Sequence, residues 1–159
     1  IIMNFELKNK ASRLLLAASF LSSFFFVSCD KTPMNGLLDG MWQLTRIETP
    51  TEQRDVKDSL VFISIQLQLV QWNNRLHFAQ YYSHFAHRGD SLLFFDMTHS
   101  SKHSLESNYD AWLTDEEMSN GLMDAWGIHT LNPGFHINTL NHSDLILQRA
   151  DTLLRLRRF

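Results

Sequence analysis

The sequence has one cysteine, three prolines and no excess of basic charge. These features restrict the possible cross-links, the interruptions of strands and the possible partners. Cys29 is the only cysteine among 159 residues, so the chain has no internal disulfide and no multi-cysteine metal site. The three prolines, Pro33, Pro50 and Pro133, all fall outside the stretches that we predict as strands. Without residues 1–28 the chain has 11 basic and 16 acidic residues, a formal net charge of −5, which argues against general nucleic-acid binding.

Catalytic motifs are missing as well. The chain has no Gly-x-Ser-x-Gly elbow, no phosphate-cradling glycine loop and no His-Glu-x-x-His helix. Eight histidines are many for this length, but the pairs His84 with His87 and His99 with His103 lack a carboxylate or cysteine to complete a ligand set. We therefore predict a protein that is not an enzyme, with no metal site and no cofactor.

Residues 1–28 have the three parts of a bacterial secretory signal. Basic residues open the segment, and residues 14–27 form an apolar run too short for a comfortable membrane-spanning helix. Ser28-Cys29 follows directly and resembles a lipobox, where diacylglycerol joins the cysteine sulfur before cleavage on its N-terminal side. We expect a lipoprotein signal peptide over residues 1–28 and a lipid on Cys29, with a plain secreted protein or an uncleaved anchor as the alternatives.

Residues 29–38 and residues 39–159 differ in pattern. The first segment is polar, contains Pro33 and Gly36 and has no periodicity, which is typical of a tether. In the second, short alternating segments are separated by polar turns, which indicates one folded domain of antiparallel strands. We predict strands at residues 40–47, 60–72, 75–87, 91–97, 135–140, 144–149 and 152–159, and a charged loop at 48–59.

The clearest predicted strand covers residues 60–72. Four apolar residues alternate there with polar ones, which places the apolar set on one face. They are Ile63, Ile65, Leu67 and Leu69. Asn73-Asn74 is the predicted hairpin turn after this strand, because asparagine tolerates positive φ.

Residues 98–120 interrupt the strand pattern, since they are polar and long for a compact domain. Thr114 and Glu117 have the spacing of a capping box, apolar residues follow at helical intervals, and Gly127 suits a helix C-terminus. We predict a short helix at 115–125, packed on the sheet or across its open end.

Seven or eight short strands with mostly hairpin connections predict an all-β fold. Closure into a small antiparallel up-and-down barrel is the simplest way for so many strands to avoid exposed edges. The predicted helix then lies before the last three strands.

Trp42 is the residue around which this barrel would close. Trp42 and Leu44 share one face of the first strand, and Arg158 shares a face with apolar residues of the last. If both faces are interior, Arg158 stacks on Trp42 near the closed end, a cation–π contact of about 1–2 kcal/mol. Arg157 takes this position if the register slips by one residue.

Gly40-Met41-Trp42 fits the Gly-x-Trp signature at the start of the first strand in lipocalin-like barrels. The run over residues 145–159, with its basic final strand, resembles the end of lipocalin-like lipoproteins of Gram-negative bacteria. The resemblance covers about residues 38–159. It implies the lipocalin-like barrel and a lipid-anchored place in the bacterial cell envelope, with the outer membrane expected, and it implies no particular activity.

Aromatic residues exceed what a minimal core needs, so they either form an ordinary core or line a cavity for a small hydrophobic ligand. The residues that we predict at the rim of such a cavity are Phe85, Phe95, Trp112 and Trp126. The predicted function is thus a membrane-anchored binding module. The alternative is an envelope protein with a filled barrel that docks a protein partner. An enzyme would require a histidine and a carboxylate to converge, for instance His77 or His136 with Asp96.

Overall fold

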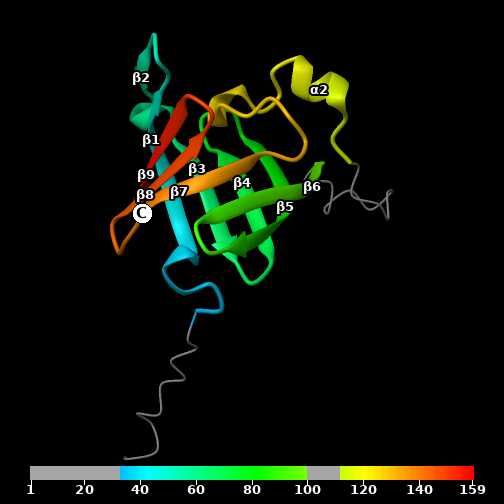
Figure 1. The fold of residues 1–159 in the computed structure, drawn as a ribbon. Coiled ribbons are helices and arrows are strands. Elements are labelled where there is room, and N and C mark those ends of the chain that lie inside the picture. The colour runs from blue at the N-terminus through cyan, green and yellow to red at the C-terminus, as the bar shows by residue number, and fades with distance from the viewer. Residues whose placement is uncertain (1–32, 100–111) are drawn as a thin grey trace, which may run out of the picture. The chain divides into compact units, whose positions relative to one another are not determined.

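The computed structural model describes residues 33–99 and 112–159, which form a closed antiparallel barrel (Figure 1). Its strands are β1 (Gly40–Glu48), β2 (Gln53–Asp55), β3 (Val61–Gln66), β4 (Leu69–Asn74), β5 (Ala79–Arg88), β6 (Ser91–His99), β7 (Gly134–Leu140), β8 (Asp144–Arg149) and β9 (Thr152–Arg158). Apart from β2, the strands pair in chain order, and β9 returns to β1. The predicted all-β up-and-down barrel is confirmed, with eight strands in its wall and β2 beside the end of β1.

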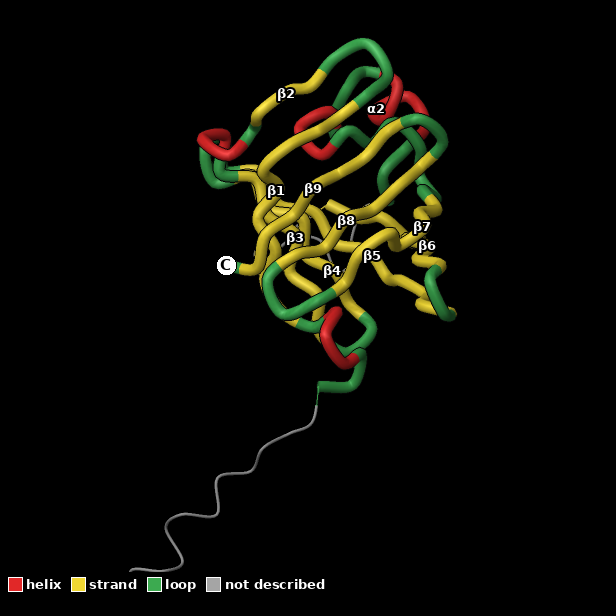
Figure 2. The backbone as a smooth tube through the Cα atoms, turned by 60° about the vertical axis from the view of Figure 1, so that its left-hand side comes forward, coloured by secondary structure: helices red, strands yellow, loops and turns green. Residues whose placement is uncertain are grey.

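The two ends of the barrel differ, as Figures 1 and 2 show. Residues 33–39, which lead into β1, lie at one end, which we call the tether-side end. The short helix α2 (Asp115–Ser119), β2 and the turn from β8 to β9 lie at the other, which we call the mouth end. Near the mouth, Arg155 joins β9 to β1, because its Nε and Nη2 donate to Glu48 Oε1 and Oε2 at 2.6 and 3.1 Å. The Arg155 hydrogen bond lowers the pKa of Glu48.

Period-two alternation fills the barrel with apolar side chains. Buried residues from alternate positions of the strands form one continuous core. Among the least exposed are Trp42, Leu44, Ile63, Ile65, Val70, Trp72, Leu92, Phe94, Leu145, Leu147, Leu154 and Leu156.

The predicted strand at 60–72 is wrong in its extent, because a hairpin turn at Leu67-Gln68 divides it into β3 and β4. A two-residue turn reverses the alternation, so Trp72 faces the core whereas Leu67 and Leu69 are exposed. The predicted turn, Asn73-Asn74, lies inside β4. Leu67 has a φ of +58°, the left-handed conformation that glycine or asparagine adopts more easily.

The predicted loop at 48–59 also contains regular structure. β2 pairs with the end of β1, and a 3₁₀ turn at Lys57–Ser59 leads into β3. All three residues of β2 are polar and exposed, so no apolar period could mark this strand in the sequence.

The helix α2 begins at the predicted capping box, in which Thr114 and Glu117 each accept a hydrogen bond from the other's backbone N–H. It ends at Ser119, earlier than the predicted end at residue 125. Gly121 explains the early end, since its φ is +84° and a Cβ there would lie 2.5 Å from Asp124 Oδ2. A separate 3₁₀ turn follows at Asp124–Trp126.

Residues 33–38, predicted as part of the tether, fold against the tether-side end. Leu38 ends a 3₁₀ turn and is fully buried. Asn35 donates from its backbone N–H to Asp39 Oδ2 at 3.0 Å and from its side-chain amide to Leu67 O at 2.8 Å. The first described turn is thereby joined to the β3–β4 turn.

The predicted signal peptide at 1–28 and Cys29 lie outside the described residues. Within the described ranges, no helix has the length and apolar character needed to span a membrane.

Candidate functional site

At the tether-side end, Trp42 packs against the last strand. Its indole is fully buried, and Nε1 donates to Leu38 O at 2.9 Å. Arg158 Cζ lies 4.4 Å from the centroid of the indole ring, and Arg158 Nη1 donates to Asp39 O at 2.9 Å. The predicted stacking contact is therefore present. Arg158 makes it rather than Arg157, because Arg158 is the residue paired with Trp42 across the β1–β9 seam.

Gly40 leaves the space that this arginine occupies. Its φ is +134°, a conformation open mainly to glycine, and a Cβ there would lie 2.5 Å from Arg158 Nη1. Arg157 is exposed and donates instead to Gln43 Oε1 at 3.2 Å. The contacts at this end are internal to the domain, which favours a structural role for Gly40, Trp42 and Arg158.

At the mouth end, side chains from the segment 112–128 fill the barrel interior. Leu113, Met118, Met123, Trp126 and Ile128 are each at most 4 % exposed. Trp126 packs edge-to-face on Trp72 and Tyr81, with ring centroids 6.2 and 5.9 Å apart. Its Nε1 donates to Phe62 O at 3.1 Å. These contacts occupy the space in which an interior ligand would lie.

A contact between a histidine and a carboxylate joins α2 to the end of β6. His99 Nε2 lies 2.8 Å from Glu117 Oε1, and Glu117 Oε2 accepts a hydrogen bond from Thr114 N at 2.8 Å. The Thr114 backbone bond and then the His99 bond lower the pKa of the Glu117 carboxyl. Burial, and then the Glu117 carboxylate, raise the pKa of Tyr81 beside His99.

Replacing Glu117 with glutamine should therefore weaken the acid sensitivity of the fold. The folded-state pKa of Glu117 lies below its ordinary value of 4.5, so its contribution is complete above about pH 4.5 and is lost as the pH falls through the lowered pKa. Urea unfolding at several pH values should show the wild type losing stability on acidification more steeply than E117Q. Glu116→Gln, at the exposed neighbour, is the matched control, and equal slopes for all three proteins would contradict the prediction.

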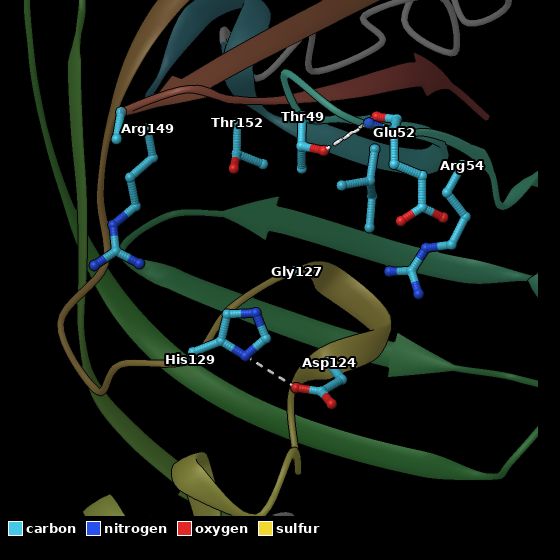
Figure 3. A pocket seen from close by; sticks show the side chains of 10 residues that line it. Thr49, Glu52, Arg54, Asp124, Gly127, His129, Arg149 and Thr152 are labelled. Carbon is cyan, nitrogen blue, oxygen red and sulfur yellow. Dashed lines mark hydrogen bonds and ion pairs between the residues drawn. The ribbon is translucent and has the colours of Figure 1, made fainter.

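A cleft of about 480 Å³ opens at the mouth end (Figure 3). It lies between the end of β1, β2, the turn from β8 to β9, and the segment 124–129. Its lining residues are Ile47, Thr49, Glu52, Arg54, Asp124, Gly127, His129, Arg149, Ala150 and Thr152. Ile47 follows Trp42 by five residues along β1, about 16 Å, so the cleft is remote from the Trp42–Arg158 contact.

The lining of this mouth cleft combines small and apolar residues with charged ones. Gly127 lies next to Ile47 and has a φ of +69°, the left-handed conformation that favours glycine. His129 Nδ1 lies 3.0 Å from Asp124 Oδ1. Arg54 and Arg149 lie on opposite sides of the cleft in Figure 3, and no ion pair found among the described residues involves either of them. Such a lining suits a small molecule with both an apolar part and polar groups.

The amino-acid sequence alone does not indicate the mouth cleft. Its polar residues lie in loops, in the short strand β2 and at the ends of β8 and β9, which are far apart in the chain and share no periodicity. The one signal in the sequence was the high content of charged residues in the segments 48–59 and 149–151. This signal points to a shared site only when the barrel fold is known to bring both segments to one end.

A second depression, of about 560 Å³, lies on the barrel wall where β6 and β7 meet. These strands share three residue pairs, the shortest ladder in the barrel wall. The lining residues are Ala86, Arg88, Ser91, Leu92, Leu93, Gly134, Phe135 and His136. The depression therefore marks the narrowest seam of the wall.

The four residues predicted at a cavity rim are not brought together. Phe85 and Trp126 are buried in the core, and Trp112 is 62 % exposed. Phe95 packs beside the exposed His84, with ring centroids 6.0 Å apart. None of the four lines either cleft. Alternation alone could not separate them, because the hairpin registers and the path of the segment 112–128 decide which aromatic rings face inward.

Histidine and carboxylate side chains do meet, but not in the predicted combinations. His136 Nδ1 lies 3.5 Å from Asp90 Oδ2, and His84 Nδ1 lies 3.4 Å from Asp96 Oδ2. All four side chains are about half exposed or more, so these pairs contribute little to stability. In the part of the chain that the structure covers, no three histidine, cysteine, aspartate or glutamate residues gather as metal ligands.

These features define a small closed β-barrel of the type that serves as a binding module, with its interior filled and a cleft of mixed apolar and charged lining at its mouth. The chain belongs to the lipocalin-like domain family, whose sequence profile matches residues 24–159.

Two solved structures are similar to this chain. A lipocalin-like protein from Bacteroides uniformis has 19 % sequence identity and a TM-score of 0.57, covering 78 % of this chain and 100 % of its own. An uncharacterised protein from Bacteroides eggerthii has 20 % identity and a TM-score of 0.53, covering 76 % and 98 %. At these identities the likeness shows the fold alone. Comparison with curated proteins finds no match.

Proposed function

We propose that this protein is a non-catalytic, lipid-anchored binding module of the bacterial envelope that holds a small amphipathic ligand in the mouth cleft. The cleft itself carries the proposal, because it offers a volume of ligand size beside Arg54, Arg149 and His129. The filled interior argues against a hydrophobic ligand deep in the barrel. Apolar parts of the ligand would instead contact Ile47 and Gly127 at the base of the cleft.

Ser28-Cys29 supports the anchor, since a small residue and a cysteine follow the apolar segment where lipoprotein processing requires them. Cys29→Ser in the full chain, expressed in a Gram-negative host, should abolish labelling by radioactive palmitate and release the protein from the membrane fraction. Fractionation of inner and outer membranes tests the expected outer-membrane location. Palmitate labelling that persists in the variant would contradict the anchor.

Native mass spectrometry of the gently purified full-length protein tests the ligand. We expect a bound small molecule whose dissociation constant rises about tenfold in Arg149→Ala, with a lower bound fraction in the spectra, because one lost charge-assisted hydrogen bond is worth about 1.5 kcal/mol or more. Arg88→Ala is the matched control, since it removes an exposed arginine from the depression at the β6–β7 seam. A protein that carries no ligand, or equal losses in both variants, would count against the mouth cleft.

Phe78 supports a second candidate function, the docking of a protein partner by a barrel without a small ligand. Its side chain is 94 % exposed, at a φ of +54°, in the turn between β4 and β5. Leu60 and Leu76 are exposed near it, and Arg75 N donates to Leu60 O at 3.1 Å. A cross-link to an envelope protein that Phe78→Ser abolishes, with Trp112→Ser as the control, would favour this function.

A further inference from the structure

We propose that the tether-side end of the barrel rests on the bilayer that holds the acyl chains of Cys29, with Leu67 of the β3–β4 turn inserted among the lipids. This placement rests on the proposed lipid anchor. It adds an orientation, since the mouth cleft then faces away from the membrane. We call the residues concerned the lipid-facing patch, and they are Met34, Leu37, Leu67 and Leu69.

The lipid-facing patch is apolar and exposed. Met34 is 65 % exposed, Leu67 58 %, and Leu37 and Leu69 about 40 % each. The hydrogen bond from the Asn35 side-chain amide to Leu67 O, at 2.8 Å, holds the first described turn against the β3–β4 turn. The patch therefore includes two segments 30 residues apart in the chain that are fixed to one another.

Leu67 is unfavourable in water for two reasons. Its φ of +58° lies in the left-handed region, where glycine and asparagine are the usual residues of a two-residue hairpin. Its side chain is also left in solvent at the tip of the turn. A leucine at such a position gains free energy only if something apolar covers it, and hydrocarbon would do so.

The length of the chain between the anchor and the barrel brings the patch within reach of the bilayer. Cys29 is four residues before Pro33, the first described residue. Four fully extended residues span at most about 14 Å. The acyl chains on Cys29 must lie in the membrane, so the segment that carries Met34 and Leu37 cannot move far from its surface.

Two of the charged side chains near the patch are already bonded within the domain, those of Asp39 and Arg158. The Asp39 carboxylate accepts from Asn35 N at 3.0 Å, and the Arg158 guanidinium donates to the carbonyls of Leu37 and Asp39. They need not lose separate hydration when the patch meets lipid. The β7–β8 turn at the same end is instead polar, with Asn141, His142 and Ser143 exposed. We therefore expect the barrel to contact the bilayer on the side of the β3–β4 turn rather than on that of the β7–β8 turn.

The experiment uses the full-length lipoprotein, produced with its own signal and reconstituted in phosphatidylcholine–phosphatidylglycerol vesicles. Because Cys29 is consumed by its thioether, a single added cysteine can carry an NBD fluorophore. Leu67→Cys and Leu69→Cys test the patch. Leu76→Cys, an equally exposed leucine at the β4–β5 turn, and His142→Cys are the matched controls. Circular dichroism checks that each variant is folded.

We expect nitroxide-labelled lipid to quench the probes at 67 and 69 about threefold more strongly than those at 76 and 142, since inserted groups lie ~5–10 Å into the interface. Intact-mass measurement reports separately whether Cys29 carries lipid. A lipidated protein with equal, weak quenching at all four positions overturns the lipid-facing patch and leaves the anchor standing. An unlipidated Cys29 overturns the anchor and the placement together.

Discussion

Replacing Trp42 with alanine is expected to lower the free energy of unfolding by about 3–5 kcal/mol, the usual cost of emptying a buried tryptophan site. The side chain is fully buried, donates to Leu38 O and lies under the Arg158 guanidinium. Urea unfolding of the full chain, followed by far-UV circular dichroism, measures the change. The cation–π contact with Arg158 accounts for only about 1–2 kcal/mol of this loss, and the rest comes from the emptied site of the indole.

Trp112→Ala is the control for Trp42, since Trp112 is 62 % exposed and its loss should change stability by no more than about 0.5 kcal/mol. If Trp42 acts only in stability, the folded variant keeps the ligand of the wild type in native mass spectra. An unchanged unfolding midpoint in Trp42→Ala would show that the tether-side end is not closed by this residue.

Trp126→Ala should be as costly, about 3–5 kcal/mol, although Trp126 lies outside the barrel strands. Its ring packs on Trp72 and Tyr81, and its Nε1 satisfies the carbonyl of Phe62. The substitution empties the interior at the mouth end and leaves that carbonyl without its partner. The same urea unfolding experiment measures the loss.

Trp126→Phe separates the two contributions at this site. Phenylalanine keeps most of the apolar volume and loses the hydrogen bond, so about 1–3 kcal/mol should be lost rather than the full amount. Wild-type stability in Trp126→Ala would mean that the segment 112–128 does not pack in the barrel. The interior would then be open to a hydrophobic ligand, as the sequence analysis predicted.

The elements predicted well from the sequence are those that local chemistry specifies. The last three strands have tight polar turns between alternating apolar residues, and their observed bounds agree with prediction within one residue at each end. The start of α2 follows from the reciprocal hydrogen bonds of Thr114 and Glu117. Gly40 and Trp42 belong to one short motif, and their contacts with Arg158 follow from the β1–β9 register.

The wrong predictions concern places where the pattern of apolar and polar side chains does not show whether the chain continues or turns. The alternation from Ile63 through Leu69 is the same whether the chain continues or turns, and only pairing of Ile63 with Trp72 shows that it turns at Leu67. The β2 strand has no apolar residue, so its pairing with β1 left no pattern to read. The number of aromatic residues indicated a large core or a cavity, but it does not determine which of these residues face the barrel interior.

The sequence by itself determined an all-β fold of antiparallel hairpins, because two-residue periodicity and turn chemistry act over a few neighbouring residues. Its lipocalin-like type was indicated only by a resemblance, that of Gly40-Met41-Trp42 and the basic final strand. Only the tertiary structure decided that the interior is filled from the segment 112–128 and that a cleft lies at the mouth. It also decided that Leu67 is exposed beside Asn35. These features depend on contacts between residues tens of positions apart, and such contacts are set by strand register and loop path rather than by local preference.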